Sequence, residues 1–282
     1  GPRIGSEGAM STLARPDSFR ARYRLVLDIA KRDLRNRFAG SHLGLLWAFI
    51  VPLSTSVVFI LVFGMLIKGT MGGIKYAKLD FTTLYFLGYA PWLLFADVVA
   101  RSTTLLRENR ALIRNLRFNH RLLPMSACAS SIVAHAVVVG ISLALVVGNG
   151  YPLSEHMYML PVYFVLLLAF TLGVSYFVAA ISVYLVDLVQ VVPIALNLFF
   201  FMTPILYTAQ LVIDSGSRLA VVALLKLNPM TQFVEGYRTA MVRVDEPIDM
   251  VAIARMAVWA GVTLVLGYST YPRLEKGFAD VL

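Results

Sequence analysis

The 282-residue chain is poor in charge and nearly free of cysteine. Charged residues make up 15% of it, against about 25% of an ordinary soluble domain, while 59% of its residues are apolar. The single cysteine, Cys128, excludes an internal disulfide and any cysteine-rich metal site. This balance argues against a soluble fold and favours a membrane protein.

Motifs that carry catalysis are also missing. The sequence contains no G-x-x-x-x-G-K-[ST] phosphate-binding loop, no H-E-x-x-H metal motif and no G-x-S-x-G nucleophile motif. Nor do Asp, His and Cys residues cluster at the spacings of metal ligands. We therefore expect no catalytic residue, no metal and no other cofactor in this chain. If it pumps a substrate, the energy must come from another polypeptide.

Long apolar runs are the dominant feature that is present. Six of them are long enough to cross a hydrocarbon core of about 30 Å, and they lie at about 43–67, 81–100, 122–147, 157–184, 188–207 and 251–271. The sequence predicts an all-α membrane protein with six transmembrane helices. We expect one transmembrane domain over 18–282, with a tag or disordered tail over 1–17.

Residues 18–40 precede the first span and are basic and amphipathic. Apolar residues recur there at spacings of three or four, with cations between them, as in Phe19, Arg20, Tyr23, Arg24 and Val26. This pattern predicts a helix that lies in the membrane interface. The alternative is a surface helix of a soluble bundle.

The distribution of cations predicts the orientation. The segment before the first span, the 101–121 loop and the tail hold nine, six and two lysines and arginines, whereas the loops of the other face hold eight. Positive residues accumulate on the cytoplasmic side, so we expect both termini in the cytoplasm. The basic net charge is better explained by anionic membrane lipids than by nucleic acid.

The segment 208–250 is too apolar for an extended loop. Residues 219–227 are apolar and 230–244 read as an amphipathic helix, so we expect two short extracytoplasmic helices between spans five and six. They are candidates for an outer gate, and a simple cap is the alternative. The candidate gate residues are Asn228, Pro229, Glu235, Tyr237 and Arg238.

Aromatic residues occur at midspan, where an interfacial belt does not explain them. Aromatic rings stack well on sugar faces, which makes these residues candidates for lining a glycan path, although packing is the alternative for any single ring. The candidate channel aromatics are Trp47, Tyr85, Tyr89, Trp92, Phe199, Phe200 and Tyr207.

In the 101–121 loop, apolar residues interleave with charges. A short helix there could offer apolar anchors and charges to a partner, although positive-inside loops often look like this. The candidate partner-binding residues are Leu105, Arg107, Glu108, Arg110, Leu112, Ile113, Arg114 and Arg117.

Five ordered blocks resemble a known family. They are KRDLRNRFAGSHLGLLWAFIVP, PWLLF, ENRALIRNLRF followed by LLP, FFFMTPILY, and LNPMTQFVEGYR. The sequence is similar over about 25–275 to the transmembrane subunits of type-two ABC exporters that move lipid-linked polysaccharides or teichoic-acid-like polymers.

The resemblance implies partners and roles. Residues 105–117 would form a coupling helix that docks into a cytoplasmic P-loop ATPase, with 19–38 beside it as an inner gate. The unit would contain a homodimer of this chain and two ATPase subunits, which bind the ATP and Mg²⁺. Arg32, Arg35 and Arg37 could attract the pyrophosphate of a polyprenyl-linked glycan at the inner leaflet.

The sequence therefore predicts a permease subunit without ATPase activity of its own. It would export a lipid-linked polysaccharide of O-antigen, galactan or teichoic-acid type across the bacterial cytoplasmic membrane. Two alternatives are a drug or small-molecule exporter of the same architecture and a membrane enzyme that acts on lipid-linked intermediates. The missing catalytic motifs count against the latter.

Overall fold

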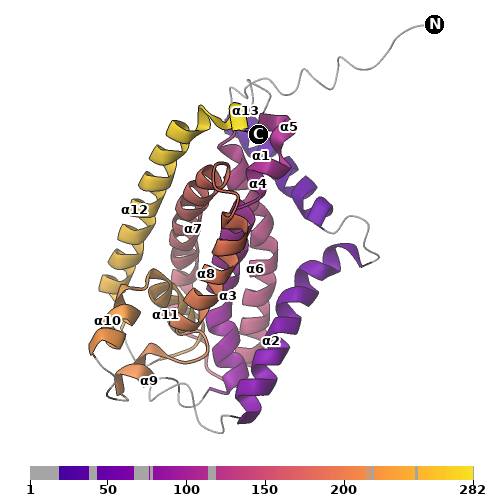
Figure 1. Cartoon of the computed structure of the whole chain (residues 1–282). Helices are drawn as coiled ribbons and strands as arrows, with labels where there is room; N and C mark the ends of the chain where they lie inside the picture. The colour runs from indigo at the N-terminus through magenta and orange to yellow at the C-terminus, as the bar shows by residue number, and fades with distance from the viewer. Residues whose placement is uncertain are drawn as a thin grey trace, which may run out of the picture.

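The computed structural model describes residues 19–37, 43–66, 76, 79–113, 119–214, 216, 219–244 and 247–281 of the chain. These residues form helices joined by turns, and the single β-type pairing among them is an isolated bridge between Leu153 and Val242. The predicted all-α fold is thus confirmed for this part of the chain. Figure 1 shows the long helices side by side, with α1 (Phe19–Arg37) and α13 (Phe278–Val281) at one end.

Four helical stretches among the described residues are long and apolar enough to cross a membrane. They are α3 (Phe81–Ser102), α6 (Leu122–Gly148), the turn η3 (Met157–Met159) with α7 (Leu160–Ser182), and α12 (Met250–Glu275). All four coincide with predicted spans, and α12 continues beyond the predicted end. Helix α3 is the most buried of the four, because it packs against α6, α7 and α11 (Pro229–Met241).

Two further apolar helices coincide with the other predicted spans but have shorter apolar stretches. Helix α2 (Trp47–Leu66) follows the turn η2 (Gly44–Leu46), and α8 (Leu188–Met202) ends before residue 207, the predicted boundary. Pro204 explains this end, since it has no N–H to donate and pushes Thr203 into the extended conformation observed there. Membrane crossing by α2 and α8 stays a prediction.

Among the described residues, three short helices lie between α8 and α12, where the sequence predicted two. Helices α10 (Leu219–Leu227) and α11 match the predicted ranges, and α9 (Ala209–Asp214) precedes them. Figure 1 places α9 and α10 at the end of the molecule opposite α1 and α13. We call this the α11 end, and we call the opposite end, formed by α1, α4 (Leu105–Glu108), α5 (Arg110–Ile113) and α13, the basic end.

Polar caps start the helices at the α11 end. Asp80 Oδ2 accepts a hydrogen bond of 3.0 Å from the Thr83 amide at the start of α3, and Asp249 Oδ1 accepts one of 2.9 Å from the Ala252 amide at the start of α12. Asn228 caps α11 in the same way. These side chains satisfy amides that have no partner within their helix and so fix where each helix begins.

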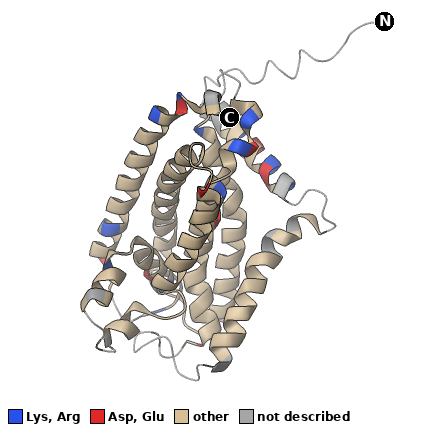
Figure 2. Ribbon diagram, viewed as in Figure 1, with Lys and Arg blue, Asp and Glu red and all other residues tan. Residues whose placement is uncertain are grey.

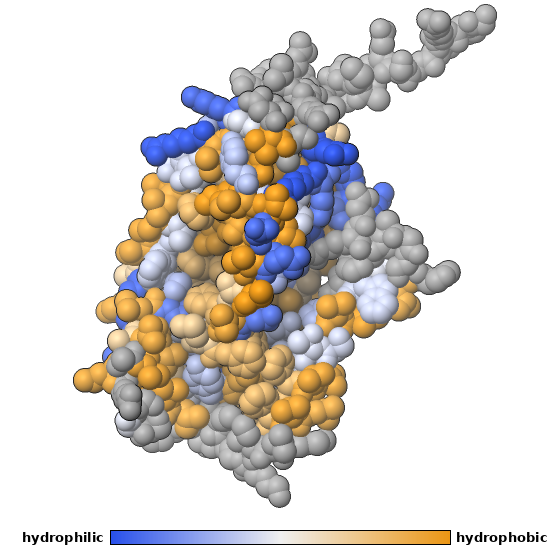
Figure 3. All heavy atoms as spheres, in the orientation of Figure 1, coloured by the Kyte–Doolittle hydropathy of each residue, from blue (hydrophilic) through white to orange (hydrophobic). Residues whose placement is uncertain are grey.

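Charge and hydropathy divide the molecule as expected for a membrane protein. In Figure 2 many blue and red ribbon segments lie around α1 and the last turns of α12, while the long helices between the two ends are largely tan. In Figure 3 much of the visible surface over α2 and around α10 is hydrophobic. Large apolar side chains are also exposed on α2 and α8, among them Val58, Leu61, Ile194 and Leu198.

Helices α7 and α12 make the closest helix contact. A Cβ atom added to Gly173 would overlap the backbone of Thr263 and Leu264, and one added to Gly267 would overlap the carbonyl of Gly173. Small residues let two helix backbones approach this closely inside a membrane. The two glycines therefore set the spacing between α7 and α12.

We expect Gly173→Ala to lower the midpoint of thermal unfolding in detergent by several degrees, because overpacking a close contact costs about 1–3 kcal/mol. Gly261→Ala is the matched control on α12, since no atom lies within 4 Å of an added Cβ there. Alanine favours a helix over glycine, so the control should match or exceed the wild type. Equal midpoints for Gly173→Ala and wild type would contradict this account of the contact.

Candidate functional site

Polar and apolar contacts at the basic end hold α1 on the bundle. Arg32 Nη2 donates a hydrogen bond of 2.9 Å to Asn109 Oδ1, and Asp33 forms an ion pair with Arg101 at the end of α3. Both partners of that pair are largely buried. Ile29 adds an apolar contact to the same region. Helix α1 is therefore attached to the segment that follows α3.

That segment, 105–113, contains two short helices where the resemblance implied one. Helix α4 ends at Glu108 and α5 starts at Arg110, and Asn109 between them has φ −103° and ψ 23°. Asn109 Nδ2 donates to the Leu105 carbonyl at 2.9 Å. Asparagine side chains compete in this way for backbone partners, which explains the break. The described part of the predicted coupling helix is thus an elbow, with its bend at Asn109.

The two faces of the elbow differ in exposure. Leu105, Leu106 and Ile113 are buried in an apolar cluster with Ile29 and Phe278. The exposed face carries the charges of the candidate set, namely Glu108 and Arg110, and Leu112 is partly buried. Arg114 and Arg117 lie outside the described residues. The elbow is therefore fixed from within and presents a charged surface outward.

Arg107 joins the elbow to a third helix. Its guanidinium donates to the carbonyl of Ser182, the last residue of α7. The carbonyls at a helix C-terminus lack partners within the helix and carry partial negative charge, so a cation is stabilised there. Arg107 thus attaches the elbow to α7 and does not belong to the exposed face of the elbow.

His120 connects the far side of the elbow to α12. Its Nε2 lies 3.1 Å from the Ile113 carbonyl and its Nδ1 lies 3.0 Å from Glu275 Oε1. The Tyr271 hydroxyl donates to the His120 carbonyl at 3.1 Å. The elbow is therefore connected through polar side chains to α1, α7 and α12.

The cations proposed for the inner gate lie on α1 in different settings. Arg32 is bound to Asn109, whereas Arg35 is exposed. The side chain of Arg37 lies outside the described part of the structure. A cavity of about 70 Å³ separates α1 from α4 and is lined by Arg32, Asp33, Asn109 and Glu108.

Most of the candidate channel aromatics form a buried cluster within one chain. Tyr85, Tyr89, Trp92 and Phe200 are buried, and Trp47 is exposed. The Tyr85 and Tyr89 rings are stacked with centroids 5.1 Å apart. Phe199 and Tyr207 are partly buried, and the centroids of Phe199 and Trp92 lie 5.7 Å apart. These rings join α3 to α8, and Phe59 brings α2 into the same cluster.

A fully buried arginine organises the α11 end. Arg238 donates to the carbonyls of Ile205 (2.9 Å), Tyr207 (3.2 Å) and, with longer geometry, Leu84 (3.4 Å). It also pairs with Glu235 Oε1 at 3.1 Å, and its side chain is 0% exposed. The chain leaves its helical form after Met202, and Arg238 satisfies two carbonyls of this break. It thereby attaches α11 to α3 and to the end of α8.

Asn228 and Pro229 hold the same break from the start of α11. Asn228 Nδ2 donates to Thr203 Oγ1 at 3.0 Å and to the Met202 carbonyl at 3.3 Å. Pro229 occupies the first position of α11, where its missing N–H costs nothing. Four of the five candidate gate residues, Asn228, Glu235, Tyr237 and Arg238, thus bond to other parts of the chain.

Tyr237, the remaining gate residue with a polar contact, reaches into the bundle. Its hydroxyl lies 3.2 Å from His135 Nε2, and His135 Nδ1 lies 2.9 Å from the Ala90 carbonyl. A carbonyl only accepts, so Nδ1 carries the proton and Nε2 accepts from Tyr237. Burial raises the pKa of the Tyr237 phenol, which keeps this donor protonated. The intramembrane histidine of α6 is thus an interhelical link.

The sequence reasoning missed two contacts at the basic end. Asp33 and Arg101 are far apart in sequence, and the available signal was that each is a charge beside an apolar stretch in need of a counter-ion. Asn109 was also missed, because the spacing of apolar residues does not show which polar side chain of a charged loop will form a contact. Among the described residues, no group of three or more His, Cys, Asp or Glu side chains could hold a metal ion.

The sequence was also compared with known protein families and proteins. The model of the ABC-2 type transporter family matches residues 24–242. An O-antigen export system permease protein RfbA of Myxococcus xanthus is 28% identical over 258 residues, which are 91% of this chain and 94% of that protein.

Two other relatives are more distant. A protein of the same name from Klebsiella pneumoniae is 22% identical over 92% of this chain and 95% of its own length. The polysialic acid transport protein KpsM of Escherichia coli is 23% identical over 87% of this chain and 91% of its own length. Because the family model covers most of the sequence, the chain belongs to the ABC-2 type transporter family.

Proposed function

We propose that this chain is the permease subunit of an ATP-driven exporter that moves a polyprenyl-linked polysaccharide across the bacterial cytoplasmic membrane. The observation that carries the proposal is the anchored elbow at the basic end in a chain of the ABC-2 family. The names of the relatives, O-antigen export permease and polysialic acid transport protein, support a polysaccharide as substrate over a drug or other small molecule.

The elbow is the element that would receive force from an ATPase subunit. Glu108 and Arg110 are exposed on it, while Leu105 and Ile113 anchor it in the apolar cluster. Its contacts reach α1, α7 and α12. A push on the exposed face would therefore displace several helices together. The partner, ATP and Mg²⁺ are expected on the cytoplasmic side, with two ATPase subunits for two copies of this chain.

Six spans fit the proposed architecture. At about 1.5 Å per residue, the 20 residues of α2 reach across a hydrocarbon core, and the 15 residues of α8 do so only with the chain that follows them. If both cross, the basic end holds both termini and faces the cytoplasm, in agreement with its cations. The apolar faces of α2 and α8 would then contact lipid or the second copy.

The transport path would start at α1 and leave at the α11 end. Arg32 and Arg35 provide cations for a pyrophosphate at the inner leaflet. The aromatic cluster would offer rings to the glycan once α2 or α8 moves away from α3. At the exit, Arg238 would release the Ile205 and Tyr207 carbonyls for the gate to open.

The exposed elbow gives the first prediction. Glu108→Ala with Arg110→Ala should reduce co-purification with the ATPase subunit while thermal stability of the permease stays unchanged, because neither side chain is buried. Leu105→Ala should instead lower stability, since burial of a leucine is worth about 2–5 kcal/mol on truncation. Pull-down and thermal unfolding measure both, and full ATPase binding by the double variant would refute the docking role.

The orientation gives a second prediction. In a Cys128→Ser background, Asn119→Cys at the basic end and Glu155→Cys at the α11 end introduce single exposed thiols. A membrane-impermeant maleimide added to intact cells should label residue 155 and leave residue 119 unlabelled until the membrane is opened. Labelling of residue 119 from outside would show that the basic end faces outward, where it could not contact a cytoplasmic ATPase.

The buried arginine gives a third prediction. Arg238→Gln should abolish glycan export and lower the unfolding midpoint, because it leaves Glu235 and two carbonyls without their cation, a loss of about 3–5 kcal/mol for a buried pair. Arg243→Gln, an exposed arginine just after the same helix, is the control and should retain export. Export by Arg238→Gln at the wild-type rate would show that the contact plays no part in the gate.

A further inference from the structure

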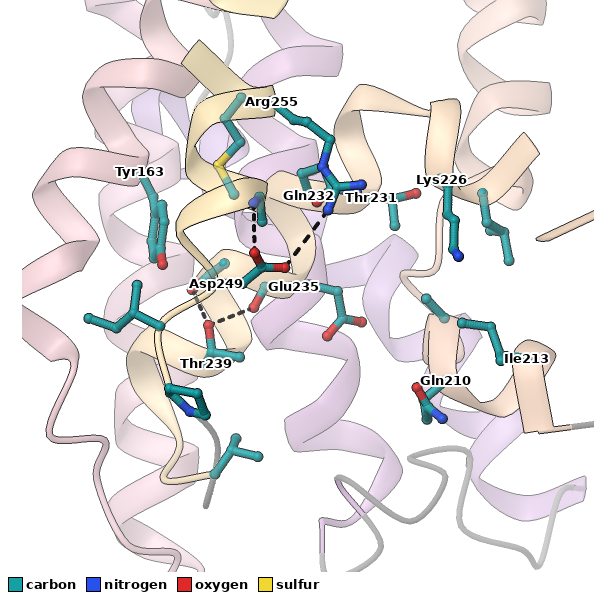
Figure 4. Close-up of a pocket in the computed structure, with 18 of the residues that line it drawn as sticks. Tyr163, Gln210, Ile213, Lys226, Thr231, Gln232, Glu235, Thr239, Asp249 and Arg255 are labelled. Atoms are coloured by element: carbon teal, nitrogen blue, oxygen red, sulfur yellow. Dashed lines mark hydrogen bonds and ion pairs between the residues drawn. The ribbon is translucent and has the colours of Figure 1, made fainter. Parts of the chain in front are cut away.

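A cavity of about 260 Å³ lies at the α11 end, away from the elbow and from the aromatic cluster. Helices α9, α10, α11 and α12 supply its walls. In Figure 4 Lys226 and Arg255 extend toward this hollow from α10 and α12, while Glu235 and Gln210 lie on its other side. The cavity thus has a cationic side and a side with acceptor oxygens.

Polar atoms of the lining lack partners among the described residues. Thr231 is 4% exposed, and its Oγ1 has no hydrogen-bond partner there. The Nε of Arg255 is likewise buried without one, and the pair that Arg255 forms with Asp249 is long, at 3.8 Å. Buried polar groups are nearly always satisfied, so these two atoms point to a ligand in the cavity.

The charges of the lining point to an anionic group in that ligand. Glu235 is neutralised by Arg238 and accepts a further hydrogen bond from Tyr76 at 3.1 Å. One carboxylate oxygen of Asp249 accepts the hydrogen bond from the Ala252 amide that caps α12. Lys226 forms no ion pair with a described residue, so the cationic side is undercompensated. A hydroxyl, a guanidinium and an ammonium together are suited to a phosphate.

Apolar surface continues from the cavity to the outside of the molecule. Leu225 and Met256 are part of its wall, and Leu224, Leu227 and Val251 beside it are strongly exposed. Acyl chains can cover this surface. A sugar is less suited, since the phenol ring of Tyr163 in the lining is 5% exposed and offers no open face for stacking.

We propose that this cavity binds the phosphodiester headgroup of a membrane glycerophospholipid, with Lys226, Arg255 and Thr231 around the phosphate. The acyl chains would lie along α10 and α12. This site is separate from the exported glycan, and its occupancy requires neither the ATPase nor transport.

The test measures lipid binding to the full-length chain purified in detergent. Phosphatidylglycerol and phosphatidylethanolamine are added and the bound lipid is counted by native mass spectrometry, with diacylglycerol, inorganic phosphate and a polyprenyl phosphate as separate arms. Lys226→Gln should weaken phospholipid binding about tenfold, as expected for loss of one charge-assisted contact. Thr231→Val should weaken it less, and Arg243→Gln, an exposed arginine near the same end, should leave it unchanged.

Several outcomes would overturn the proposal. Equal retention of diacylglycerol would show that the phosphate is not recognised. Binding of inorganic phosphate without binding of either phospholipid would show that the site recognises an anion and not a lipid. Retention of polyprenyl phosphate in preference to both phospholipids would assign the cavity to the transport substrate. Lys226 is exposed, so Lys226→Gln is expected to fold. Unchanged phospholipid binding by this variant would exclude the cavity as the binding site. None of these results depends on export or on the ATPase.

Discussion

The fold depends on one constraint, which is that backbone groups cannot be left unpaired where water is absent. Regular helices meet it by themselves, so the informative places are where helices break. After Met202 the freed carbonyls of Ile205 and Tyr207 are taken by Arg238, and after Ser182 at the end of α7 a carbonyl is taken by Arg107. In both cases an arginine from a distant segment completes a helix end. The same contacts that make the breaks tolerable therefore also connect segments that are far apart in the sequence.

This constraint gives the two ends different mechanical properties. At the basic end the elbow is attached to several helices through polar side chains and an apolar cluster, which supports its proposed role in transmitting displacement. At the α11 end, the attachment of α11 to the end of α8 runs largely through Arg238 and Asn228. Hydrogen bonds to carbonyls can be exchanged for water at an opening mouth at small net cost. If α11 acts as the proposed gate, such bonds would keep it stable when closed and dry, and little free energy would be lost when it opens and becomes wet.

Much of the fold was predictable because hydropathy alone dictates where helices can lie in a membrane. The helices near 81–100, 122–147, 157–184 and 251–271 were found in this way, as were α10 and α11. Which helices pair was not predictable, since the approach of α7 to α12 depends on Gly173 and Gly267, and small residues occur along many spans. The role of the candidate gate residues as a gate stays a prediction, and the contacts of Arg238 were not predictable, because a buried arginine can donate to any nearby carbonyl. The elbow was located, while its bend at Asn109 arises from a local side-chain contact that periodicity cannot detect.

Glu235 relates the inferred lipid site to the gate. One of its carboxylate oxygens holds Arg238, and the same side chain lines the cavity beside Lys226 and Gln210. In the proposed site the phosphate would be held by Lys226 and Arg255, neither of which pairs with Glu235 among the described residues, so a bound headgroup would leave the ion pair of Glu235 with Arg238 in place. Any effect of the proposed lipid on the proposed gate would be reciprocal, so a lipid that changed how readily Arg238 is released would itself be bound more or less tightly once Arg238 is released.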